Sequence, residues 1–349
     1  TPPDKVERAV EIIKDILDYS RVEAGKLALK EERLDLLGLI LEVFGLLRPG
    51  IEGRDIDFKL DLDLVCPDAL VGDCGRLRQV LFNLVGNAVK FTEAGHVLVS
   101  VRGDAVDGAG RMRVTISVAY TGIGIPPDKQ DYVFGEFNQV EEGKNRGHDG
   151  AGLGLSITRK LMDLMGGSIH LDSEPGRGST FICDVELGCA SEPERVNAAL
   201  HNEIPDIRLI GPIFSERAHA VIGTLAGLGA RIRTQPQLGD TFEAGRGEAI
   251  FFSADTDTVS RWAEDVRRRG HEGPLLHICD DPDEAPPGLV PVLPSEGPDS
   301  VAERLIKQEV HDEAANDGQG AITARPQPAQ PEKPVRLTLL AAEDNRTNR

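Results

Sequence analysis

Three polar side chains on one predicted helix have the chemistry of a magnesium–phosphate site. Asn83, Asn87 and Lys90 follow one another at helical spacing, and positions i, i+4 and i+7 lie on one face of a helix. A carboxamide oxygen can ligate Mg²⁺, and an ammonium group can neutralise phosphate charge. By themselves, asparagines on a helix are more often surface or capping residues, so this interpretation needs support from the rest of the chain.

Glycine-rich segments provide that support. Gly122 and Gly124 lie in one loop, and residues 150–154 (Gly-Ala-Gly-Leu-Gly) lead into a predicted helix. Glycines let backbone amides approach a phosphate, and the N-terminus of the following helix attracts it. A third glycine turn, within residues 173–181, leads into a predicted strand. A lone glycine loop is a weak signal, and the helix after residue 154 strengthens it.

The elements that must position these residues form an α+β sandwich. Alternating apolar residues predict strands over residues 97–101, 113–118 and 180–186, and helical spacing predicts helices over residues 73–90 and 151–165. Such a mixture favours helices packed on one face of a mixed sheet.

The flanking segments differ in pattern. Residues 4–24 predict one amphipathic helix that ends near Gly25, and such a helix needs a partner in a hairpin or dimeric bundle. Short strands alternating with helices over residues 205–310 predict a doubly wound α/β domain with a parallel sheet. The predicted order is a partial helical hairpin at 1–28, the sandwich at 29–190, the α/β domain at 200–310, a proline-rich linker at 311–334, and the first strand of another domain at 335–349.

Composition limits the classes of function. The net charge of −19 disfavours nucleic acid and anionic membranes as partners, although a local phosphate site remains compatible with it. The five cysteines show no CxxC pair, which is typical of reduced thiols in a cytoplasmic protein. No apolar run approaches the length of a membrane-spanning helix, and no signal peptide is visible.

Taken together, the motifs resemble those of sensor histidine kinases. Residues 15–27 (Asp-Ile-Leu-Asp-Tyr-Ser-Arg-Val-Glu-Ala-Gly-Lys-Leu) resemble the end of the second dimerisation helix of that family. The asparagine helix is similar to its N box, residues 122–124 to its G1 box, residues 132–139 to its F box, and residues 150–154 to its G2 box. Gyrase-like and chaperone-like ATPases of the same superfold lack the first of these motifs.

The resemblance implies a GHKL (Bergerat) fold that binds ATP and Mg²⁺. Asn87 would ligate the metal, residues 138–150 would form a mobile lid, and no catalytic residue follows from the motifs. The implied nucleotide-binding positions are Asn83, Asn87, Lys90, Tyr120, Gly122, Gly124, Lys144, Arg146, Gly150, Gly152, Leu153 and Gly154.

Tyr120 is the clearest departure from the family pattern. It stands where the family has an aspartate that accepts a hydrogen bond from the adenine amino group. A phenol carries no negative charge at neutral pH, and its ring is large enough to fill the adenine pocket. The departure therefore predicts weakened ATP binding.

The phosphoacceptor is the second departure. None of the eight histidines lies in a His-Glu-x-x-x-x-Pro context, so the resemblance places the phosphorylated helix before residue 1. The whole protein would be a homodimer through its dimerisation helices and would pass phosphate to a downstream phosphotransfer protein.

The α/β domain resembles a receiver that has lost its chemistry. Gly211 and Pro212 stand at the acidic pair, Ser253 at the phosphoacceptor aspartate, Cys279 at the serine or threonine, and Leu293 at the lysine. Another small α/β domain is the alternative. Some hybrid kinases use such a pseudo-receiver to bind cyclic di-GMP, and the arginines at 267–269 could contact a phosphate. A solvated helix end explains these arginines better, because cations favour helix C-termini. Glu343 and Asp344 match the acidic pair of a true receiver.

These observations predict the core of a hybrid histidine kinase that a pseudo-receiver restrains. A pseudokinase scaffold that never hydrolyses ATP, and a second-messenger reader, remain as alternatives.

Overall fold

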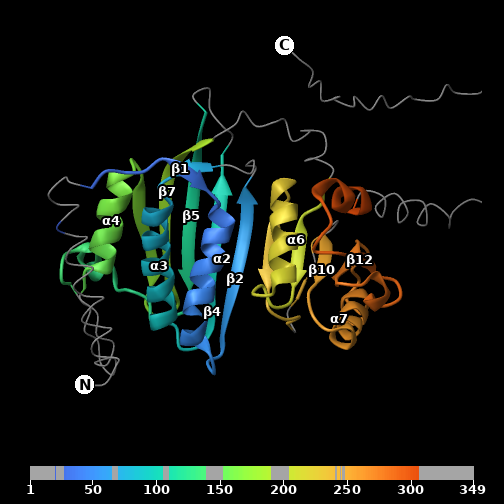
Figure 1. Ribbon diagram of the computed structural model, residues 1–349. Coiled ribbons are helices and arrows are strands. Elements are labelled where there is room, and N and C mark those ends of the chain that lie inside the picture. The colour runs from blue at the N-terminus through green and yellow to red at the C-terminus, as the bar shows by residue number, and fades with distance from the viewer. Residues whose placement is uncertain are drawn as a thin grey trace, which may run out of the picture.

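The computed structural model describes residues 20, 27–64, 70–104, 110–138, 152–189, 204–239, 242–243, 245 and 248–305. The predicted helix at 4–24, the linker at 311–334 and the strand after residue 335 lie outside the described residues, apart from residue 20. Among the described residues, one sheet of 12 strands runs through the whole molecule, and the helices pack on its two faces (Figure 1).

The first half is a mixed sheet with helices on one face (Figure 1), as the sequence predicts for the sandwich. Its strands are β1 (Glu32–Leu34), β2 (Ile56–Leu64), β3 (Leu70–Gly72), β4 (Gly95–Gly103), β5 (Arg111–Tyr120), β6 (Ser168–Glu174) and β7 (Gly178–Cys189). Its helices are α2 (Leu36–Leu47), α3 (Cys74–Phe91) and α4 (Gly154–Leu164), with 3-10 turns η1 (Arg48–Ile51), η2 (Pro127–Lys129) and η3 (Tyr132–Phe134). The strand order is β1-β3-β7-β5-β4-β2, with β6 beside β7, and only β2 and β4 in this set pair in parallel.

Local sequence explains why α3 forms where it does. The Asp73 side chain accepts a hydrogen bond from the Arg76 amide at 3.0 Å and caps the helix, which satisfies one of its free amides. Leu77, Leu81 and Leu84 are fully buried along one stripe, and burial of each such side chain contributes about 1.5–3 kcal/mol. The buried stripe fixes the rotation of the helix, and therefore fixes where its polar face points.

The second half is a parallel sheet covered on both faces. Its elements are β8 (Ile207–Ile210), α6 (Glu216–Gly227), β9 (Ile232–Gln235), β10 (Ala249–Phe252), α7 (Thr256–Arg268), β11 (Leu275–Ile278), η5 (Pro282–Glu284) and β12 (Val290–Val292), followed by helical residues 298–305. The strand order β9-β8-β10-β11-β12 is the doubly wound order 2-1-3-4-5. The apolar side of α6 belongs to the core shared with the first half, and that of α7 to a separate cluster, so the two helices cover opposite faces.

The two halves are joined strand to strand, which the sequence did not predict. The edge strand β2 pairs antiparallel with β9, with Asp61 opposite Arg233 and Leu62 opposite Ile232. Next to this register, the Leu60 amide donates to the Thr234 hydroxyl at 2.8 Å in a buried position. Since an unpaired strand edge is a template for unwanted pairing, β9 also protects β2.

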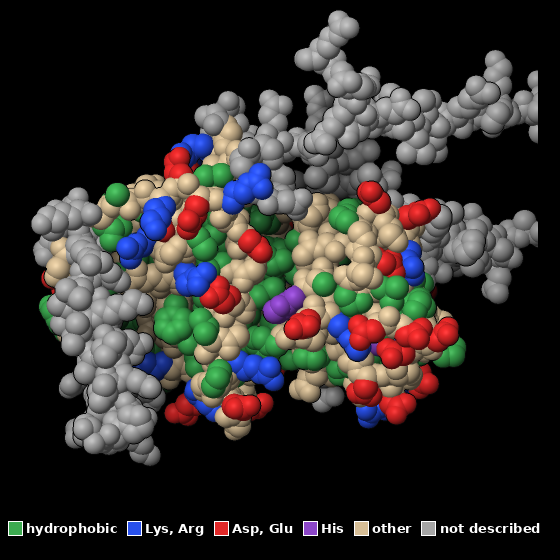
Figure 2. Space-filling model, viewed as in Figure 1, with side chains coloured by type: hydrophobic (Ala, Val, Ile, Leu, Met, Phe, Trp, Pro, Cys, Tyr) green, Lys and Arg blue, Asp and Glu red, His purple; other side chains and the backbone are tan. Residues whose placement is uncertain are grey.

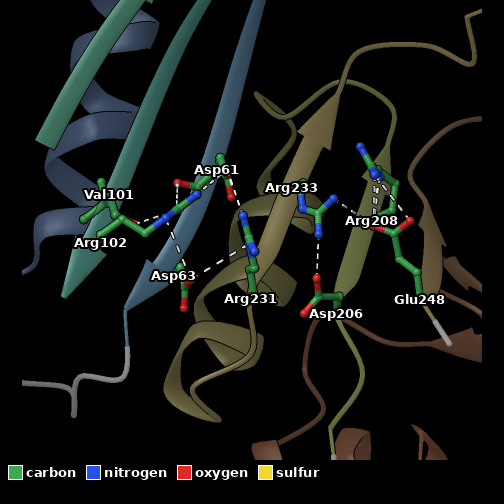
Figure 3. Close-up of polar contacts among 9 residues, drawn as sticks. All are labelled: Asp61, Asp63, Val101, Arg102, Asp206, Arg208, Arg231, Arg233 and Glu248. Atoms are coloured by element: carbon green, nitrogen blue, oxygen red, sulfur yellow. Dashed lines mark hydrogen bonds and ion pairs between the residues drawn. The ribbon is translucent and has the colours of Figure 1, made fainter. Parts of the chain in front are cut away.

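Charged side chains along the junction alternate in sign (Figure 3). Asp61 accepts a hydrogen bond from Arg102 at 2.5 Å and lies 3.5 Å from Arg231 across the junction. Asp63 lies 3.8 Å from Arg102 and 3.9 Å from Arg231. The carboxylates of β2 thus lie between arginines of both domains. These groups are partly exposed, so the network contributes orientation more than stability.

Three aromatic rings pack on the helix side of the same junction. Phe44 of α2 stacks on Phe58 of β2 with ring centroids 4.6 Å apart, and Phe214, which precedes α6, packs edge-on against Phe58 at 5.9 Å. Arg48 lies over the Phe214 ring at 5.3 Å. The junction therefore combines backbone pairing, an ion-pair network and an apolar contact.

A double-mutant cycle tests this junction. Phe58→Ala and Phe214→Ala should be coupled by about 0.5–1.5 kcal/mol, because an edge-to-face aromatic pair contributes that much beyond its buried area. Urea unfolding followed by Trp262, the single tryptophan and a part of α7, measures the effect on the second domain.

The matched control pairs Phe58→Ala with Phe242→Ala, since Phe242 packs on the separate cluster beneath α7. That pair should be additive. Additivity in the Phe58–Phe214 cycle as well would show that the domains do not dock in this way.

Candidate nucleotide-binding site

The polar face of α3 meets the first turn of α4. The Asn83 carboxamide nitrogen donates to the Gly154 carbonyl at 3.2 Å and lies 3.4 Å from the Thr158 hydroxyl. Thr158 in turn donates to the Gly154 carbonyl at 2.8 Å. The structure therefore brings together the asparagine helix and the glycine segment before α4, and Asn83 holds that helix start in place.

Asn87 and Lys90 continue this face toward the end of α3. Both are half-buried, and the Lys90 ammonium lies 5.0 Å from the centroid of the Phe91 ring. The Phe91 carbonyl closely approaches Gly122, where any Cβ would overlap it. The face thus runs from the start of α4, at Asn83, to the glycine loop, at Gly122.

The glycine loop rests on the turn between β6 and β7. Gly124 has φ +68°, and a Cβ there would overlap the Glu174 carbonyl. The Ile125 amide donates to the Ser173 hydroxyl at 2.7 Å, and the Gly176 amide donates to the Ile123 carbonyl at 2.7 Å. The third glycine turn of the sequence therefore supports the first loop.

The segment before α4 is shaped for an anion. Gly152 has φ +68° and packs against the backbone of Phe137, which a Cβ would approach to 2.9 Å. Leu153 is buried, and in the described residues no side chain caps the first turn of α4. Free amides at a helix N-terminus attract phosphate. The predicted lid positions Lys144, Arg146 and Gly150 lie outside the described residues.

Tyr120 is a core residue beneath the glycine loop. Its side chain is 5% exposed, and its ring stacks on Phe181 with centroids 6.4 Å apart. The phenol is hydrogen-bonded to the Ser179 hydroxyl, which lies 2.8 Å from the Ser173 hydroxyl. Burial raises the pKa of Tyr120, against the smaller opposing effect of the Ser179 hydrogen bond, so the side chain is uncharged at neutral pH.

Sequence reasoning singled out the glycine turn within residues 173–181 but gave no role to its Ser173, Ser179 or Phe181, and it did not identify Thr158. The sign of these residues in the sequence was a serine on each side of the third glycine turn. That such a serine accepts a hydrogen bond from a loop amide becomes apparent only once the loop is folded against it.

Neighbouring Cys183 is also buried, and burial, with a smaller contribution from Asp184, raises the pKa of its thiol to about 12.

In the second domain, the residues that the sequence aligns with the reactive positions of a receiver lie just after strands. Pro212 follows β8, Ser253 follows β10, Cys279 follows β11 and Leu293 follows β12. Ser253 is buried with its hydroxyl 3.3 Å from that of Ser215, and Cys279 is fully buried. Within the described residues, no cluster of histidine, cysteine and acidic side chains suits a metal ion.

The arginines at the end of α7 are engaged within their own domain. Arg267 donates to the carbonyls of His271 and Gly273 at 2.8 and 2.9 Å, and Arg269 pairs with Asp265 at 2.5 Å. These contacts satisfy groups at the C-terminal end of α7. They therefore favour a structural role for the arginines at 267–269 over a phosphate contact. In the described part of the chain, no helix combines the length and apolar character needed to cross a membrane.

Comparisons with known proteins show what this site is similar to. Residues 72–188 match the family described as histidine kinase-, DNA gyrase B-, and HSP90-like ATPase. The signal transduction histidine-protein kinase BarA of Escherichia coli K12 is 40% identical over 176 residues, which are 50% of this chain and 19% of BarA. The sensory/regulatory protein RpfC of Xanthomonas campestris pv. campestris is 39% identical over 170 residues, which are 49% of this chain and 23% of RpfC.

A solved structure matches a larger share of the chain. Full-length ShkA in complex with AMPPNP is similar with a TM-score of 0.52 and 26% identity, over 88% of this chain and 63% of ShkA. The chain spans about a fifth of the length of the curated relatives named above. Residues 72–188 thus form a histidine kinase-type ATPase domain, of the kind found in two-component hybrid kinases.

Proposed function

We propose that this chain is the nucleotide-binding and regulatory part of a hybrid sensor histidine kinase. The whole protein would transfer the γ-phosphoryl group of ATP to a histidine and then to a receiver aspartate. The observation that carries this proposal is the continuous polar face of α3, which connects the uncapped start of α4 with the glycine loop. Phosphoryl transfer depends mainly on positioning and electrostatic stabilisation, which such a face can provide.

The residues present fit a magnesium nucleotide. The Asn87 carboxamide is half-buried and makes no hydrogen bond to any described residue, so its oxygen is available as a ligand. Asn83 positions the start of α4, whose amides would receive phosphate oxygens, and Lys90 would add positive charge. Bound Mg²⁺ would neutralise charge on the transferring phosphoryl group.

Tyr120 weakens the adenine half of this site. Its ring lies in the core beneath the glycine loop, and its hydroxyl is committed to Ser179. Loss of a charge-assisted hydrogen bond to adenine costs about 1.5–3 kcal/mol, roughly 10- to 150-fold in affinity. The pocket therefore binds ATP weakly while its phosphate half remains.

The second domain acts as a docked pseudo-receiver. Its 2-1-3-4-5 strand order suits a receiver, its strand ends carry proline, serine, cysteine and leucine in place of the reactive groups, and the ShkA likeness extends over both domains. Because β9 continues the sheet of the ATPase domain, docking restrains the movement that the kinase domain needs to reach its histidine. Phosphorylation cannot release it.

A pseudokinase scaffold is the second candidate function, and the burial of Tyr120 in a satisfied hydrogen-bond network favours it. In that case the α3 face is a remnant and the domains serve only to hold partners. The engagement of Arg267 and Arg269 leaves the proposed cyclic di-GMP contact without support from the structure.

Calorimetry with Mg·ATP separates the two candidates. Tyr120→Asp should bind Mg·ATP about 10- to 150-fold more tightly than the wild-type chain, since it restores the charged acceptor. Tyr132→Asp adds the same charge at an exposed tyrosine of η3 and should leave the affinity unchanged.

Equal, tight binding by the wild-type chain and Tyr120→Asp would refute the assignment of Tyr120. Absence of binding in both would favour the scaffold. Because a buried aspartate can unfold the domain, Tyr120→Asn, which keeps a neutral acceptor, is measured alongside and circular dichroism checks the fold of each variant.

The restraint is tested in the full-length protein that contains this chain. Removal of residues 205–310 should raise the rate of autophosphorylation, because the sheet extension no longer holds the ATPase domain. Phe214→Ala, which weakens the aromatic contact at the junction, should raise it less, and Phe242→Ala should not. An unchanged rate after the deletion would refute the restraint.

A further inference from the structure

A groove separates the two domains on the helix side of the sheet. It lies between α2 and α6, and the end of β2 forms its floor. Figure 2 shows the hollow between the two halves of the molecule, with hydrophobic side chains along it. Its volume of about 630 Å³ lies within the ~300–1,000 Å³ of pockets that hold small molecules, which are frequent between domains.

The floor and one wall of the groove are leucines. Leu62 and Leu64 of β2 form the floor, and Leu37 and Leu41 of α2 form part of the wall. Leu37 and Leu64 are only half-buried in the structure. Covering them would be favourable at about 25 cal/mol for each Å² of apolar area.

The opposite wall of the groove is made of small residues of α6, which leave the groove wide. Gly223 lies within α6, and a Cβ built there would meet no atom within 4 Å. Packing therefore does not require glycine at this position, although glycine inside a helix costs about 1 kcal/mol relative to alanine. Ala226 and Gly227 extend the same wall. The width of the groove thus depends on small side chains, and one of them, Gly223, weakens the helix interior.

One imidazole nitrogen and two carboxylates define the polarity of the groove. The Nε2 atom of His219 is buried and has no hydrogen-bond partner in the described structure. It can donate to a carbonyl or accept from a hydroxyl, according to its tautomer. Asp35 and Glu42 also line the groove. Glu42 is paired with Arg78 at 2.7 Å, so the charge of Asp35 is the one that disfavours an anionic ligand by like-charge repulsion.

We propose that this groove binds an uncharged, mainly apolar small molecule with one hydrogen-bonding group, which His219 contacts. Because both domains form its walls, such a ligand binds only the docked arrangement and stabilises it by mass action. The binding site is inferred from the geometry of the groove alone. Its regulatory consequence, a molecule that strengthens the restraint on the kinase domain, rests on the proposed function.

Fluorescence titration with prodan tests the site. Prodan is a neutral naphthalene with one carbonyl acceptor, and its emission responds to the polarity around it. The wild-type chain should bind it saturably at one site, and bound prodan should raise the melting temperature of the chain. Gly223→Trp should weaken binding at least tenfold by filling the groove, and Ala226→Phe should do the same from a deeper position.

Gly45→Trp is the matched control. Gly45 is also a glycine within a helix with open space around its Cβ position, but it does not line the groove, so binding should be unchanged. His219→Phe keeps the size of the side chain and should weaken binding about two- to tenfold, the value of one hydrogen bond. Anionic 1-anilinonaphthalene-8-sulfonate should bind more weakly than prodan.

Non-saturable binding, or equal loss in Gly223→Trp and Gly45→Trp, would overturn the site. Equal binding of the anionic probe, or no effect of His219→Phe, would overturn the ligand class. These outcomes do not depend on ATP, so failure of the groove proposal is distinguishable from failure of the kinase assignment.

Discussion

The antiparallel pairing of β2 with β9 is the interaction on which the arrangement of this protein depends. Backbone hydrogen bonds across a strand pair have a fixed direction and register, so they orient two domains more strictly than side-chain contacts can. The Leu60 amide bonded to Thr234 and the arginines around Asp61 and Asp63 reinforce one register. A one-residue slip would turn these side chains to the opposite face.

In the proposed function, this pairing would give the second domain a mechanical role without chemistry of its own. The reactive positions of a receiver lie at the carboxyl ends of parallel strands, and here those ends are closed by Ser253, Cys279 and neighbouring apolar residues. A domain without a phosphorylation site can still change the populations of docked and undocked states, provided that a ligand distinguishes them. Residues of both domains line the groove beside α6, so the ligand proposed there would distinguish the two states.

Tyr120 packs in the core at a position where the resemblance expects a residue that binds adenine. An aspartate at the end of β5 would have to keep its charge near Phe181, and a buried charge without a partner is costly. The tyrosine instead contributes apolar area and satisfies its hydroxyl with Ser179. The tyrosine therefore stabilises the sandwich beneath the glycine loop, at the position where the proposed function expects an adenine contact to be lost.

Much of the fold follows from local patterns. The Asp73 cap and the leucine stripe of α3, the alternation in β5, and the β-α alternation after residue 205 are properties of short segments, and the structure contains these elements. The family match over residues 72–188 agrees with the ordered glycine and asparagine motifs.

The sequence by itself determined the types of elements, the polar face of α3 and the anomaly at residue 120, because each depends on neighbours within a few turns or strands. Only the tertiary structure decided that β2 pairs with β9, that Ser173 and Ser179 support the glycine loop and the Tyr120 phenol, and that a groove lies between α2 and α6. These contacts join residues distant in the chain, and their partners are selected by packing and register, which no local pattern encodes.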